Sequence, residues 1–219
     1  MNYIEFLLWV RGPAFQIAIA VLVFGISFRL LEILLLGRSP EYAAPRGSAV
    51  WGGFRTLLTR TLSEESIFRR APLVIIAGYV FHLGLFIVIL LLVPHILVFK
   101  DLLGFSWSGL PTPLIDAIAV ITLLALFILL INRIKHPVLR FLSTSADYFA
   151  WVITFLPLLT GYMAYHHMVN PYPFILGLHI LSVEILMIFF PFTKLMHAFT
   201  LVIARWYNGA NAGHKGVQA

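Results

Sequence analysis

The chain has 219 residues, of which 61% are hydrophobic and only 11% are charged, and its mean hydropathy is +0.96. A soluble domain carries about 25% charged residues, so this chain has too few charged groups to cover a surface that faces water. These values exclude an ordinary globular enzyme, a nucleic-acid-binding protein and a disordered protein. The sequence contains no cysteine and eight histidines. It therefore holds neither disulfides nor an Fe–S cluster of its own, and the histidines need an explanation.

Five segments are long and apolar enough to cross a bilayer as helices, which takes about 20 residues each. We place them at about residues 14–36, 72–99, 114–131, 146–165 and 174–203. Continuous apolar runs of this length favour helices over barrel strands. The sequence therefore predicts an all-α membrane protein, a bundle of five transmembrane helices that forms one membrane domain over residues 1–219.

The positions of the basic residues predict how the bundle is oriented. Five spans put alternate loops on the same side of the membrane. One side then carries thirteen of the fifteen Lys and Arg residues: Arg29, Arg38, Arg46, Arg55, Arg60, Arg69, Arg70, Arg133, Lys135, Arg140, Lys194, Arg205 and Lys215. Because basic residues accumulate on the cytoplasmic side, we predict that the N-terminus lies outside and the C-terminus lies in the cytoplasm.

The connection over residues 37–71 is the longest segment outside the spans. Its apolar residues recur at helical spacing: Trp51, Phe54, Leu57, Leu58 and Leu62. This pattern predicts an amphipathic helix that lies in the cytoplasmic interface of the membrane. It is also compatible with a docking surface for a cytoplasmic partner subunit.

Four histidines fall at two matched depths on the second and fifth predicted helices. Since these two helices run antiparallel, His82 and His197 share the inner level, and His95 and His179 share the outer level. One imidazole on each face of an iron is what bis-histidine ligation of a haem requires, and helix bundles often hold such cofactors. Zinc fits less well, because it prefers three or four ligands.

Helical spacing supports this pattern on one helix better than on the other. The 18 residues from His179 to His197 are five whole turns, about 27 Å. The 13 residues from His82 to His95 leave these side chains about 140° apart on an ideal helix, although a kink at Pro94 would re-aim the ring of His95. The alternative partners for His179 are His166 and His167, which close the fourth helix on the outer side.

Other polar residues allow two interpretations each. Arg29 either pairs with Glu32 one turn away or contacts a haem propionate. Asp116 either stabilises the first turn of the third helix or accepts a proton from a quinol. Glu184, well inside the fifth span, is either part of a proton path or a protonated carboxyl group that fixes helix packing.

Several segments of the sequence resemble the gamma subunit of membrane-bound respiratory nitrate reductase. These are Phe81-His82-Leu83-Gly84, Ser143-Thr144-Ser145-Ala146-Asp147, Leu178-His179-Ile180 and Phe190-Pro191-Phe192-Thr193-Lys194-Leu195-Met196-His197. The likeness covers the five helices in order. The segment Thr160–His167 is similar to the related membrane cytochromes of sulfite-reductase-linked and heterodisulfide-reductase-like complexes.

The resemblance implies a di-haem cytochrome b that exchanges electrons between quinol and an Fe–S subunit. It implies that His82 and His197 bind the iron of an inner haem b, and that His179 and His95 bind that of an outer one. The partners implied are an Fe–S subunit and a catalytic subunit on the cytoplasmic side of a bacterial or archaeal cytoplasmic membrane. We place quinol at the outer end, with Asp116, His166 or His167 accepting its proton. The rival hypothesis is a haem-free membrane anchor or small transporter whose histidines bind protons or a metal.

Overall fold

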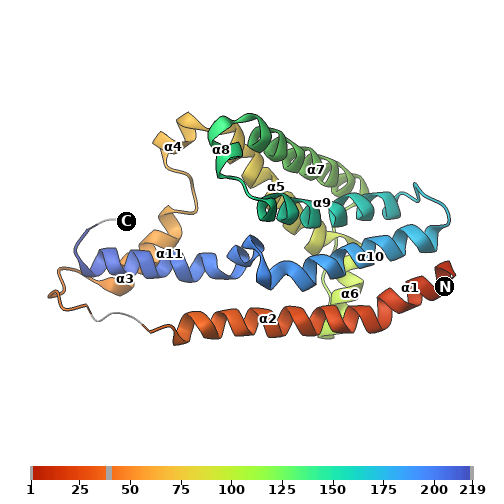
Figure 1. Cartoon of the computed structure of the whole chain (residues 1–219), viewed down its shortest axis with the longest axis horizontal. Coiled ribbons are helices and arrows are strands. Elements are labelled where there is room, and N and C mark those ends of the chain that lie inside the picture. Colours follow the sequence, from red (N-terminus) through yellow and green to blue (C-terminus); the bar gives the residue numbers. More distant parts are fainter. Residues whose placement is uncertain (1, 38–40, 218–219) are drawn as a thin grey trace. The chain divides into compact units, whose positions relative to one another are not determined.

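The structure is a computed structural model, and it describes residues 2–37 and 41–217. Helices dominate this part of the chain, and no strand occurs in it (Figure 1). The helical elements are α1 (Tyr3–Trp9), the π-helical turn η1 (Val10–Ala14), α2 (Phe15–Leu35), α3 (Ala49–Thr59), α4 (Glu65–Arg70), α5 (Pro72–Leu91), α6 (Val93–Leu103), α7 (Thr112–Lys135), α8 (Pro137–Leu142), α9 (Ser145–Tyr165), α10 (Tyr172–Phe189), the 3-10 turns η2 (Phe190–Phe192) and η3 (Lys194–Met196), and α11 (His197–His214).

Five helical segments of the described chain are long and apolar enough to cross a membrane, which confirms the predicted all-α fold. They are Tyr3–Leu35, Pro72–Leu91, Thr112–Lys135, Ser145–Tyr165 and Tyr172–Phe192. The first begins well before the predicted residue 14, because α1, η1 and α2 follow one another without a break.

The contacts divide the chain into two compact units, where the sequence predicted a single membrane domain. The first unit comprises Met1–Gln16 and Ala71–Leu186, and the second comprises Ile17–Arg70 and Met187–Ala219. Each unit therefore combines segments that are far apart in the sequence.

The core of the first unit lies between α5, α7 and α9. Phe81, Ala125, Leu126 and Leu158 are all less than 10% exposed and pack together. The indole of Trp151 donates a hydrogen bond to the carbonyl oxygen of Leu126 at 2.9 Å. These contacts hold α5, which carries His82, against α7 and α9.

The second predicted span, 72–99, is broken in the structure. Helix α5 ends at Leu91, Leu92 has an extended backbone, and the separate helix α6 begins at Val93, with Pro94 in its first turn. A proline has no N–H to donate to the carbonyl four residues earlier, which here belongs to Leu90. The indole of Trp107 donates to that carbonyl instead, at 2.6 Å, and the Leu110 N–H donates to the carbonyl of Leu91 at 3.0 Å. The following loop thus satisfies the acceptors that the break releases.

The fifth predicted span, 174–203, is also interrupted. Helix α10 ends at Phe189, two 3-10 turns follow, and Thr193 between them is extended. Pro191 in the first turn cannot continue the α-helical hydrogen bonds. His197 is consequently the first residue of a new helix, α11. The prediction that five uninterrupted turns join His179 to His197 is therefore wrong.

In the second unit, α3 and α11 pack backbone to backbone through small residues. A Cβ atom added at Gly52 would lie 2.7 Å from the Cα of Gly213, and one added at Gly53 would lie 2.5 Å from the indole nitrogen of Trp206. Small residues four positions apart permit this close approach of two helices. The sequence predicted a helix in the 37–71 connection that lies on the membrane interface. The structure has that helix, α3, and packs it against α11.

The chain before α3 is tied to the end of α11. The Arg46 N–H donates to the carbonyl of His214 at 2.8 Å, and the ammonium of Lys215 lies 3.3 Å from a carboxylate oxygen of Glu41. The N–H of Ala43 and the charge of Lys215 lower the pKa of the exposed Glu41 carboxyl group. These bonds add to the contact between the two helices.

Candidate functional site

The rings of His95 and His179 lie next to each other in the first unit. Their centroids are 6.1 Å apart and their planes differ by 22°. His95 is the third residue of α6 and His179 lies in the middle of α10, and both side chains are half-buried. The break at Pro94 therefore helps to bring the two rings together, because it sets the direction of the helix that carries His95.

Backbone and side-chain groups orient both rings. The Nδ1 atom of His95 lies 3.0 Å from the carbonyl oxygen of Val88. Since a carbonyl only accepts, Nδ1 carries the proton and Nε2 is the nitrogen with a lone pair. The Nδ1 atom of His179 lies 3.5 Å from Oγ1 of Thr160, which also donates to the carbonyl of Leu156 at 2.6 Å. Second partners of this kind typically orient metal-binding imidazoles.

A glycine leaves room beside His179. A Cβ atom added at Gly161 of α9 would lie 2.9 Å from Cε1 and 3.1 Å from Nδ1 of the imidazole. A side chain at this position would displace the ring. Gly161 therefore makes the approach of α9 to the His179 ring possible.

The distance between the His95 and His179 rings can be compared with that of two imidazoles that bind one metal ion. Two metal–nitrogen bonds of about 2 Å each, plus about 1 Å from each nitrogen to its ring centre, separate the two centroids by about 6 Å. The observed value of 6.1 Å agrees with this requirement. The distance alone is thus compatible with two imidazoles on one iron, and the rings are stacked with 22° between their planes.

Of the three residues predicted to accept protons from quinol, two lie in contact with each other and the third does not. Nε2 of His166 lies 3.2 Å from a carboxylate oxygen of Asp116, and both side chains are about 30% exposed. The hydroxyls of Thr112 and Tyr165 lie 3.2 Å apart in the same part of the unit. His167 instead stacks on Tyr172, with 4.4 Å between the ring centroids. A carboxylate beside an imidazole forms a suitable acceptor for a proton from a bound hydroxyl group.

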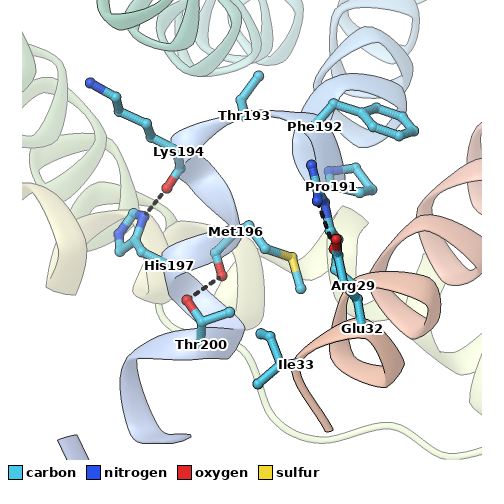
Figure 2. A pocket seen from close by; sticks show the side chains of 10 residues that line it. All are labelled: Arg29, Glu32, Ile33, Pro191, Phe192, Thr193, Lys194, Met196, His197 and Thr200. Atoms are coloured by element: carbon cyan, nitrogen blue, oxygen red, sulfur yellow. Dashed lines mark hydrogen bonds and ion pairs between the residues drawn. The ribbon is translucent and has the colours of Figure 1, made fainter. Parts of the chain in front are cut away.

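Arg29 and His197 line one cavity of about 400 Å³ in the second unit (Figure 2). The Arg29 guanidinium lies 2.8 Å from Glu32, so the predicted ion pair forms. Nδ1 of His197 lies 2.8 Å from the carbonyl oxygen of Lys194. Ile33, Pro191, Phe192 and Met196 give the cavity apolar walls. Its lining combines these apolar walls with the charged residues Arg29, Glu32 and Lys194.

His82, the remaining predicted ligand, belongs to the first unit. Its Nδ1 atom lies 2.7 Å from the carbonyl oxygen of Gly78, one turn earlier on α5, and its side chain is exposed. His82, His95 and His197 thus share one arrangement, in which a backbone carbonyl accepts from Nδ1. The pairing of His82 with His197 stays a prediction.

The sequence analysis missed the residues that support the histidines. Trp107, Thr160 and Gly161 show no signal in helical periodicity, because their roles depend on which helix lies opposite. The one available signal was Pro94, whose missing N–H implies an unsatisfied carbonyl nearby. Within residues 2–37 and 41–217, no three His, Asp or Glu side chains form a group that could hold a metal ion alone.

The fold places the chain among multi-pass helical membrane proteins. No protein-family model and no solved structure matches it. The chain is similar to a protein from Nitratidesulfovibrio vulgaris that is described only as a protein, with 32% identity over 137 residues. That match covers 63% of this chain and 60% of the relative. The chain thus spans less than two thirds of the length of that relative.

Proposed function

We propose that the chain is a di-haem cytochrome b subunit of a respiratory complex, which transfers electrons between membrane quinol or quinone and an Fe–S subunit. The observation that carries this proposal is the His95–His179 pair, with ring centroids 6.1 Å apart and Nδ1 of His95 bound to the Val88 carbonyl. Haem supplies reversible one-electron transfer when it is bound between such imidazoles. The outer haem is held by these two residues.

The inner haem is held by His82 and His197 in this proposal. The cavity beside His197 supports the assignment, because its walls are apolar and Arg29 and Lys194 contribute positive charge to its lining. A haem presents an apolar macrocycle and two negatively charged propionates. Arg29, already oriented by Glu32, would pair with a propionate.

The outer end of the bundle carries the quinol site. Oxidation of a quinol releases protons, and Asp116 and His166 form a pair that can receive them in succession. The close contact of these two side chains, 3.2 Å, supports them as the acceptors. His167 is engaged with Tyr172 and has the smaller role.

The basic residues and the exposed apolar face of α3 support a cytoplasmic partner. Trp51, Phe54 and Leu58 lie on one side of α3 and are 68%, 54% and 76% exposed. The positive-inside rule supports a cytoplasmic position for α3 and the surrounding arginines, with the N-terminus outside. An Fe–S subunit, with a catalytic subunit behind it, would dock here in a bacterial or archaeal cytoplasmic membrane.

A reduced-minus-oxidised visible spectrum of the purified chain tests the proposal. We expect the sharp absorption bands of low-spin haem b and two haems per chain. A chain purified from haem-replete cells without these bands would contradict the proposal and favour the haem-free anchor or transporter. Asp116→Asn and His167→Ala then test the quinol site: the first should lower quinol oxidation by about 10²-fold or more, and the second should leave it nearly unchanged.

A further inference from the structure

Glu184 is a buried acid that the proposed electron-transfer function does not use. It lies on α10 within the span Tyr172–Phe192, and it is only 2% exposed. Within the described chain, neither of its carboxylate oxygens has a hydrogen-bond partner. Buried polar groups in folded proteins are nearly always paired, so an exception of this kind requires an explanation.

An ionised carboxylate in this position would be very costly. Moving an unpaired charge into an apolar environment costs so much free energy that the group takes up a proton instead. Acidic residues inside membrane helices are rare for this reason, and they commonly mark proton pathways. A neutral carboxyl group at Glu184 carries one proton that it can donate.

The contacts of α10 locate this group relative to the first helix of the chain. The rings of Tyr3 and Phe174 lie 5.7 Å apart, and a Cβ atom added at Gly177 would lie 2.5 Å from Phe6. The two helices therefore run parallel in the first unit. Glu184 is seven residues beyond Gly177, which is about two turns, so it lies on the same face of α10.

Seven residues beyond Phe6, the first helix reaches the π-helical turn Val10–Ala14. Val10 is fully buried and Ala14 is 8% exposed, so this face of the turn lies within the protein. Pro13 inside the turn has no N–H, and one carbonyl in the preceding turn loses its usual donor. Single π turns inside α-helices frequently occur at functional sites.

We propose that Glu184 holds an exchangeable proton inside the membrane domain and is a proton-transfer site at the level of the π turn. The charged groups on the elements around it are Glu5 and Arg11 of the first helix, both exposed, and the His95–His179 pair lies on another side of α10. A coupling of this proton to electron transfer rests on the proposed haem function.

Infrared spectroscopy of the full chain tests the proposal without any need for haem. The wild-type minus Glu184→Gln difference spectrum at neutral pH should contain the C=O stretch of a protonated carboxyl group. That band should shift to lower frequency in D2O, because the proton exchanges. Glu184→Asp should keep a band at a changed frequency, which preserves the test if the Gln variant does not fold. The control is Glu32→Gln, which should not remove the band, because Glu32 is paired with Arg29.

Two results would overturn the proposal. If the C=O band is the same in the wild type and in Glu184→Gln, the carboxyl group is ionised or bound to a cation. If the band is present but does not shift in D2O, the proton is locked and Glu184 is a packing residue. In a haem-loaded sample, the reduced-minus-oxidised infrared spectrum should also contain the Glu184 band. If the Glu184 band does not change when the haem is reduced, only the coupling to electron transfer is contradicted. If the chain shows no haem spectrum, only the proposed function is contradicted.

Discussion

Two proline-containing breaks, one in each unit, end an apolar helix and place a histidine near the start of the next. At Pro94 the freed carbonyls find donors in Trp107 and Leu110, and His95 comes to lie beside His179. At Pro191 two 3-10 turns separate the helices, and His197 opens α11 on the wall of a cavity. Each break therefore sets the direction of the histidine that follows it. At Pro94 the loop after α6 supplies hydrogen-bond donors to the freed carbonyls, whereas at Pro191 the chain continues through two 3-10 turns.

Removing a histidine at each break should have the largest effect. His95→Ala and His197→Ala should each lower the haem content of the purified chain from two haems to one, because a haem iron bound by one imidazole is held far more weakly. The pyridine haemochrome assay gives the haem-to-protein ratio. His166→Ala and His167→Ala are the matched controls and should keep both haems. Loss of a haem in either control, with His95→Ala unaffected, would assign the outer ligand to the end of α9 instead.

Filling the space at Gly161 should weaken only the site at the first break. The added Cβ in Gly161→Ala would lie 2.9 Å from the His179 ring, and overpacking of this kind costs about 1–3 kcal/mol. We therefore expect roughly tenfold to hundredfold weaker binding of the outer haem, measured by haem transfer to an apo-haem protein. Gly78→Ala is the control, since a Cβ there meets nothing within 4 Å. Equal loss in both variants would mean that the contact with His179 is not responsible.

Substitution in the α3–α11 contact should weaken the second unit and spare the first. In Gly52→Ala the new Cβ would overlap the backbone of Gly209 and Gly213, at a cost of about 1–3 kcal/mol in the free energy of unfolding. Denaturation in mixed detergent micelles measures this value. The spectral band of the haem bound to His95 and His179 should persist at denaturant concentrations that remove the other. Simultaneous loss of both bands would show that the two sites depend on each other.

Composition made the five spans predictable, because long apolar segments must form helices in a bilayer. The predicted depth of each histidine is less secure, because His95 and His197 lie beyond the ends of the spans Pro72–Leu91 and Tyr172–Phe192. The direction of each side chain did not, because counting 100° per residue holds only along an unbroken helix. Across Pro94 this count separates His82 and His95 by about 140° on an ideal helix, and across Pro191 it aligns His179 with His197. Neither count applies, because α6 and α11 are separate helices from α5 and α10.

The rest of the candidate site depends on groups that meet only in the folded chain. Nothing in the sequence indicates that Gly161 faces His179, or that Asp116 contacts His166 across fifty residues. Glu184 illustrates the reverse case, because its position inside a span was evident, whereas its lack of a partner is a property of the packing. Local pattern therefore identifies the chemical groups, and tertiary contacts decide which of them act together.

The smallest expected effect concerns the hydrogen bond that the Leu90 carbonyl accepts at the first break. Trp107→Phe keeps the aromatic contacts with Phe99 and Phe105 but removes the N–H that donates to the carbonyl of Leu90. This should cost about 0.5–1.5 kcal/mol, the net contribution of a typical hydrogen bond. In a Pro94→Ala background, the backbone N–H restored by the substitution can donate to the same carbonyl by continuing α5. The cost of Trp107→Phe should then fall by about 1 kcal/mol.

The other break supplies the matched control for this double-mutant cycle. Pro191→Ala restores an N–H in the second unit, whereas Trp107 and its acceptor belong to the first, so the two effects should add within about 0.5 kcal/mol. Unfolding in mixed micelles gives all the required free energies. Coupling with Pro94 but not with Pro191 would establish that the Trp107 indole replaces the missing proline N–H. Additivity in both pairs would instead mean that Trp107 contributes through its ring contacts, and that the Leu90 carbonyl is satisfied in another way.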